Sequence, residues 1–120
     1  MLMPSTEVAT FSSAHSSAEI DLELFTFVER YATTLVRWDL ILFFGKNPDA
    51  GWTAVEVATH LRRSVSVATK ELDDLTYLRV LVRQYTPERT TYRLTRRATV
   101  RRAAIRLAQL DDKPGYAAMI

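Results

Sequence analysis

The chain has 120 residues, enough for one domain with a modest core. It contains no cysteine, which excludes disulfides and thiolate metal sites. Its longest apolar run, Leu40 to Phe44, is too short to cross a bilayer, and the N-terminal residues lack the pattern of a secretory signal. We therefore expect a cytoplasmic protein that makes no membrane contact.

The net charge of +2 conceals a strong segregation of charge along the chain. Residues 1–78 carry six basic and eleven acidic side chains, whereas residues 79–106 carry nine arginines and a single acid, Glu88. Arginine suits phosphate and base-edge geometry better than lysine does. This distribution indicates a surface for a polyanion, and a solvated surface without a partner is the alternative.

The N-terminal part is expected to contain a leader and one helix. Residues 1–16 are rich in Ser, Thr and Ala without a sustained period, which predicts a flexible leader. From residue 17 the apolar residues recur at helical spacing, and Leu22 and Phe25 widen the face formed by Ile20, Leu24, Phe27, Val28 and Tyr31. A helix with so many apolar residues must pack on the main body or on a second copy of itself. The second arrangement would form a homodimer.

A second helix is expected to form the centre of the core. Thr33 and Thr34 lower helix propensity and predict a break before it. Apolar residues then dominate residues 34–44, and Gly45 is expected to end the helix. Residues 47–51 read as a loop, and Trp52 is expected to pair with a later strand.

Two short helices joined by a tight turn come next. Thr53 and Glu56 form a capping box, and Ser64 can cap the second of the two helices. Arg62 and Arg63 lie in the turn between them. The buried faces are expected to be Val57, Ala58 and Leu61 in the first helix and Val65, Ala68, Leu72 and Leu75 in the second.

The last elements are two strands and a helix. Residues 80–85 and 91–94 alternate in character around the polar turn 86–90, which predicts an antiparallel pair with Tyr92 and Leu94 on its packed face. Thr95 can cap a final helix that ends at residues 114–115, and residues 113–120 are expected to form a loose tail. The predicted apolar stripe of this helix is Val100, Ala103, Ala104 and Leu107.

From Trp38 to about Thr95 the chain resembles the winged helix-turn-helix domains of bacterial transcriptional regulators. The resemblance rests on Thr53-Ala54-x-Glu56-Val57-Ala58-x-x-Leu61, Ser64, Leu72-x-x-Leu75 and the two strands that follow. It implies an α+β, mostly α fold in which residues 17–112 form a single domain, with the helix-turn-helix and wing at residues 53–95 and an added helix at each end. It further implies double-stranded DNA as the partner and a role in transcription regulation.

The sequence departs from the family pattern in two respects. Glycine is usual in the turn after Leu61 and again four residues after Leu75, where this chain has Arg62 and Arg79. We expect Arg79 to adopt an ordinary backbone conformation. The second helix of the motif is also not basic, because Glu71, Asp73 and Asp74 outweigh Lys70.

The resemblance and the charge distribution together predict the residues that contact DNA. Polar and small side chains of the second helix would enter the major groove, the arginines of the turn would bind phosphates, and those of the wing would bind the backbone or the minor groove. The predicted residues are Arg62, Arg63, Ser66, Val67, Thr69, Lys70, Arg83, Arg89 and Arg93. For the wing arginines, Glu88 is expected to be the only nearby acid available for pairing.

The sequence is also compatible with other functions. A winged-helix module that binds a protein partner is the main alternative, since the second helix is partly acidic. The final helix, rich in arginine, could extend a phosphate contact or pair with the acidic N-terminal helix of a partner chain, so a homodimer could form through the N-terminal helix with or without the final helix. No catalytic, metal or cofactor site is expected, because His60 lies alone on the polar side of a short helix and no catalytic motif is recognisable.

Overall fold

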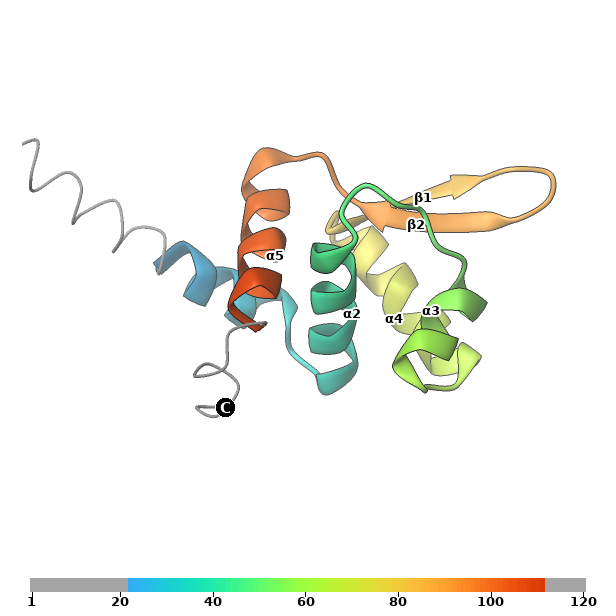
Figure 1. The fold of residues 1–120 in the computed structure, drawn as a ribbon, viewed down its shortest axis with the longest axis horizontal. Helices are drawn as coiled ribbons and strands as arrows, with labels where there is room; N and C mark the ends of the chain where they lie inside the picture. The colour runs from blue at the N-terminus through green and yellow to red at the C-terminus, as the bar shows by residue number, and fades with distance from the viewer. Residues whose placement is uncertain (1–21, 112–120) are drawn as a thin grey trace, which may run out of the picture.

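The computed structural model describes residues 22–111, which form helices packed beside a two-stranded hairpin (Figure 1). The elements are a helix over residues 22–31, α2 (Leu35–Lys46), α3 (Ala54–Leu61), α4 (Val65–Tyr77), β1 (Leu81–Tyr85), β2 (Thr90–Leu94) and α5 (Ala98–Asp111). This order and content confirm the expected winged helix-turn-helix, with one added helix on each side. The predicted leader 1–16 and tail 113–120 lie outside the described residues.

Helix α2 forms the centre of the core. It begins after Thr34, whose Oγ1 accepts a hydrogen bond from the Arg37 backbone N–H at 3.1 Å, and the predicted break at residues 32–34 is confirmed. Leu40, Ile41 and Phe44 are at most 1% exposed. Figure 1 shows α2 between α5 on one side and α3 and α4 on the other.

In residues 22–111 no helix is long and apolar enough to span a membrane.

The prediction that Gly45 ends α2 is wrong. The helix continues to Lys46 and is capped by Asn47, and Gly45 is buried within its last turn. A Cβ built on Gly45 would lie 2.3 Å from the carbonyl oxygen of Ala104 in α5. Glycine is therefore present here because two helix backbones approach closely, a tertiary reason that the sequence pattern of a helix stop does not reveal.

The helix-turn-helix forms as its caps predict. Thr53 Oγ1 accepts from the Glu56 backbone N–H at 3.1 Å, and Glu56 Oε1 accepts from the Thr53 N–H at 2.8 Å. These hydrogen bonds hold the pKa of Glu56 below its usual value. Ser64 Oγ accepts from the Val67 N–H at 3.2 Å and starts α4.

Two arginines in left-handed backbone conformations terminate α3 and α4. Arg62 has φ of 55° and Arg79 has φ of 67°, so the expectation of an ordinary conformation for Arg79 is wrong. After α3 the Arg63 N–H donates to Ala58 O at 3.0 Å, and after α4 the Val80 N–H donates to Leu75 O at 2.9 Å. Both ends are Schellman motifs, whose geometry imposes a positive φ whether or not glycine is present.

We therefore predict that Arg62→Gly and Arg79→Gly each raise the free energy of unfolding by about 0.5–1 kcal/mol. A left-handed residue with a Cβ costs about 1–2 kcal/mol, and the greater freedom of glycine in the unfolded chain offsets part of the gain. Denaturant unfolding would show a higher midpoint at an unchanged slope. Arg89→Gly is the control, because Arg89 has no positive φ and should gain nothing; equal effects at all three positions would contradict the backbone explanation.

The β1–β2 hairpin, residues 81–94, forms the wing. Its register pairs Leu81 with Leu94 and Tyr85 with Thr90, and Trp52 adds an antiparallel bridge to Tyr92, as predicted. Tyr92 and Leu94 are buried on the packed face. Figure 1 shows the wing extending away from α5, beyond α3 and α4.

Three details of the predicted packing are wrong. Thr95 does not cap α5, which starts later at Ala98; Thr95 is buried, and its Oγ1 accepts from the Arg97 N–H at 3.2 Å, ahead of the helix. Val65, the first residue of α4, is 45% exposed, since the residues that bury that face begin one turn later. Leu22 and Phe25 are 65% and 60% exposed, whereas Leu24 and Phe27 supply the buried contact of the N-terminal helix.

Candidate nucleic-acid interface

The outward side of α4 is polar and accessible near its start. Ser66 is exposed, Val67 is 42% exposed, and Thr69 is half-buried. The Lys70 side chain is 70% exposed. These four predicted residues thus lie on one helix within its first two turns, where hydroxyl, methyl and ammonium groups are available to a partner.

The acidic residues of α4 are paired within the protein. Arg37 of α2 donates from Nε to Glu71 Oε1 at 2.7 Å and from Nη2 to Asp74 Oδ2 at 3.1 Å. Lys70 Nζ lies 3.0 Å from the same Asp74 oxygen. The hydrogen bond to Lys70 is the main reason why the pKa of Asp74 is lowered, and the bond to Glu71 is the main reason why the pKa of Arg37 is raised.

The third acid of α4 binds the wing. Asp73 Oδ1 accepts from Arg83 Nη1 and from the Tyr92 hydroxyl, each at 2.7 Å. Burial, and then the bond to Asp73, raise the pKa of Tyr92 to about 12. The expectation that Glu88 is the only acid available to the wing arginines is therefore wrong, because Asp73 is distant in sequence but adjacent across the α4–wing contact.

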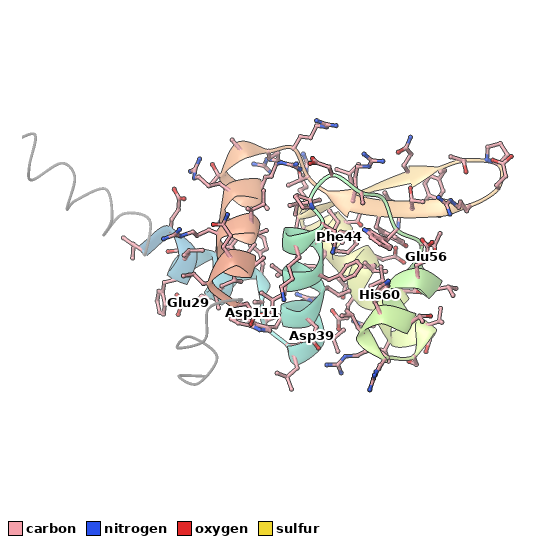
Figure 2. The ribbon with its side chains drawn as sticks, in the orientation of Figure 1. Glu29, Asp39, Phe44, Glu56, His60 and Asp111 are labelled. Carbon is pink, nitrogen blue, oxygen red and sulfur yellow. The ribbon has the colours of Figure 1, made fainter. Side chains whose placement is uncertain are left out.

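The two arginines of the turn differ in their surroundings. Arg62 is exposed and makes no ion pair with any residue in the described part of the chain. Arg63 Nη2 lies 2.6 Å from Asp39 Oδ2 of α2. Figure 2 shows Asp39 in the part of α2 that lies alongside α3, with side chains ending in nitrogen projecting from the turn below α3. Arg62 is therefore the more available of the pair.

The wing contributes two more unpaired arginines. Arg89 is exposed at the hairpin turn, where its N–H donates to Thr86 Oγ1 at 3.1 Å. Arg93 is half-buried on the outer face of β2; its guanidinium lies beside Gly51, and its Nε has no partner among the described residues. Arg83 differs from both, since its charge is paired with Asp73 and its guanidinium lies 5.3 Å from the centre of the Tyr85 ring.

The arginines of α5 divide into paired and unpaired groups. Arg101 pairs with Asp49 of the loop between α2 and α3, and Arg102 Nη2 lies 3.1 Å from Glu23 Oε2 of the N-terminal helix. Helix α5 thus pairs with the N-terminal helix of its own chain, and the expected pairing with that of a partner chain stays a prediction. Across residues 22–111, the arginines that follow α4 and have no ion pair are Arg79, Arg89, Arg93, Arg96, Arg97 and Arg106.

Two features of this surface were not predicted from the sequence. The role of Arg37 depends on Glu71 and Asp74, which are distant in sequence, and its place in a mainly apolar helix was the only local signal for it. Arg79 and Arg97 line a shallow hollow at the base of the wing beside Val82 and Tyr85. Their convergence depends on the positive φ of Arg79 and on the start of α5, neither of which was predicted.

A second hollow lies on the far side of the molecule from α3 and α4. It has a volume of about 550 Å³ between the N-terminal helix and α5, and it is mainly apolar. Its wall includes Leu22, Phe27, Tyr31, Val100 and Ala103. The exposed Leu22 side chain continues this apolar surface outward.

The fold and the arrangement of these residues define a winged helix-turn-helix protein. No family model matches the sequence, and no curated protein matches it either. Among solved structures, the chain is similar to reduced HlyU from Vibrio cholerae, with a TM-score of 0.59 at 15% identity over 84% of this chain and 98% of that one.

Two further solved structures have the same fold. An S. aureus MepR variant bound to an oligodeoxyribonucleotide has a TM-score of 0.55 at 16% identity, over 84% of this chain and 76% of that one. YusO from Bacillus subtilis has a TM-score of 0.55 at 13% identity, over 100% of this chain and 86% of that one. At these identities the comparisons establish the fold.

Proposed function

We propose that this protein binds double-stranded DNA and acts as a small transcriptional regulator. The observation that carries the proposal is a helix-turn-helix and wing in which Arg62 of the turn and Arg89 of the hairpin are exposed without an ion pair in the described residues, while the start of α4 is accessible. The same fold in MepR binds an oligodeoxyribonucleotide. A helix of this kind fits the major groove, and a wing can reach the backbone or the minor groove beside it.

The contacts divide by chemistry. Ser66, Val67 and Thr69 offer hydroxyls and methyl groups to base edges, whereas Lys70 offers a charge to phosphate. Arg62, Arg89 and Arg93 supply charge without an internal partner in the described chain, and so they are assigned to phosphates or the minor groove. Arg63 and Arg83, predicted as direct contacts, are better suited to fixing the turn and the wing through Asp39 and Asp73.

The alternative of a protein-binding module loses its main support. It rested on the acidic part of α4, and each of those carboxylates is paired with a basic side chain. Acids neutralised in this way do not present a free negative surface to a basic protein.

We further propose a homodimer formed through the N-terminal helix and α5. Leu22 and Phe25 are large apolar side chains that are more than half exposed, and Leu22 also lines the apolar hollow between the two helices. Exposed apolar patches of this kind mark association sites. A dimer would present two recognition helices to successive major grooves, about 34 Å apart.

Phe25→Asp is expected to convert the dimer to a monomer, because a charge would be buried in the interface. Sedimentation velocity on the full chain measures the change directly. Val82→Asp is the matched control: it introduces the same charge at an exposed apolar position of the wing, and it should leave the mass unchanged. Equal masses for the Phe25 variant and the unaltered chain would contradict the proposed interface.

Selection of bound duplexes from a random pool tests the proposed function. We expect enrichment of a sequence with two related half-sites, as base contacts from a dimer require. Retention of DNA without enrichment would restrict the function to general duplex binding. Failure to retain any duplex would contradict it.

A further inference from the structure

The charge of α4 is unusual for a helix assigned to DNA. Its three carboxylates, on Glu71, Asp73 and Asp74, outnumber its one basic residue, Lys70. Unpaired carboxylates next to a phosphate backbone would weaken binding through like-charge repulsion. The wing neutralises Asp73 through Arg83, so the charges that need a further explanation are those of Glu71 and Asp74.

Arg37 of α2 contacts both of these acids with one guanidinium. Its Nε–Glu71 distance is 2.7 Å and its Nη2–Asp74 distance is 3.1 Å. The side chains of Arg37 and Glu71 are 18% and 13% exposed, so salt screens this pair less than it would screen a surface pair. The planar fork of arginine suits two acids one turn apart, because separate nitrogens can donate to each carboxylate.

The start of α2 holds the guanidinium in place. Nη1 of Arg37 donates to Thr33 Oγ1 at 3.3 Å, and the backbone N–H of the same residue donates to the capping oxygen of Thr34. Arg37 thus connects the break before α2 to the middle of α4. At 18% exposure it offers little surface of its own to a ligand.

We propose that Arg37 is a positioning residue for DNA binding, which fixes α4 against α2 and masks the negative charge of Glu71 and Asp74 from the duplex. This inference rests on the proposed function. It explains how a helix with excess acid can face a polyanion: Arg37 and Lys70 together balance Glu71 and Asp74, so the net charge that the duplex meets is that of the neighbouring unpaired arginines.

The test separates charge masking from packing by restoring charge balance. Arg37→Met leaves Glu71 without its main partner, and we expect affinity for a fixed duplex at low salt to fall about tenfold. Arg37→Met combined with Glu71→Gln has the net charge of the unaltered chain and keeps the Lys70–Asp74 pair, so it should regain most of the loss. Arg37→Lys keeps the charge near Glu71 and should bind within about threefold of the unaltered chain.

Lys46→Met is the control, since it removes one positive charge that is paired with Asp111 at the other end of α2. Its affinity should stay within about twofold. The inference is overturned if Arg37→Met binds as the unaltered chain does, or if the double variant binds as weakly as Arg37→Met. Absence of duplex binding by the unaltered chain would instead overturn the proposed function, and the inference with it.

Discussion

Replacing both Arg89 and Arg93 with alanine is expected to weaken binding to all duplexes alike, by about tenfold to a hundredfold at low salt. Both arginines belong to the wing, and neither forms an ion pair with an acid in residues 22–111. Two lost phosphate contacts would also reduce the slope of log affinity against log salt by about two. A binding titration over several salt concentrations, with two unrelated duplexes, measures both quantities.

The control for the wing prediction is the double change to lysine. Lysine keeps the charge that a phosphate contact requires, and so the Arg89→Lys, Arg93→Lys variant should recover most of the affinity. Thermal unfolding of each variant checks that the half-buried Arg93 is not needed for folding. A loss confined to one of the two duplexes would contradict the assignment to phosphates and would indicate base reading by the wing.

Gly45→Ala is expected to destabilise the fold by about 2–3 kcal/mol. Alanine normally favours a helix interior over glycine by about 1 kcal/mol, and this gain is outweighed here by overpacking. The added Cβ would lie 2.3 Å from the Ala104 carbonyl oxygen and 3.0 Å from Ala108 Cβ, so α2 and α5 must separate. Denaturant unfolding of the variant measures the loss.

Gly51→Ala is the matched control for this prediction. The nearest atom to its added Cβ is Arg93 Nη2 at 3.2 Å, the end of a flexible side chain that can shift. We expect a change within about 0.5 kcal/mol, as is usual away from tightly packed sites. If alanine at both glycines had the same small effect, the close approach of α2 and α5 would not be the reason for Gly45.

Local signals in the sequence were sufficient to predict the elements of the fold. The capping box at Thr53 and Glu56, the cap at Ser64 and the alternation around Tyr92 depend on residues close together in the chain, and all form as predicted. The errors concern contacts between elements. Gly45 looked like a helix stop because the backbone of Ala104, which explains it, is far away in sequence.

The candidate site was less predictable for the same reason. The positions of Arg62 and Arg89 follow from their places in a turn and a hairpin, so residue type and spacing predicted their exposure. Which arginines remain available to a ligand depends on which of them form ion pairs with acids on other elements. Arg63 pairs with Asp39 and Arg83 with Asp73, across contacts between separate elements that no local pattern predicts.

The most direct test of the proposed function is the binding of the unaltered chain to a labelled mixed-sequence duplex across a salt series. With Arg62, Arg89, Arg93 and Lys70 near phosphates, we expect clear binding at low salt. Log affinity should fall linearly with log salt, with a slope of about −3 to −4 per chain. No binding at the lowest salt, or binding that does not change with salt, would contradict the assignment of this surface to DNA.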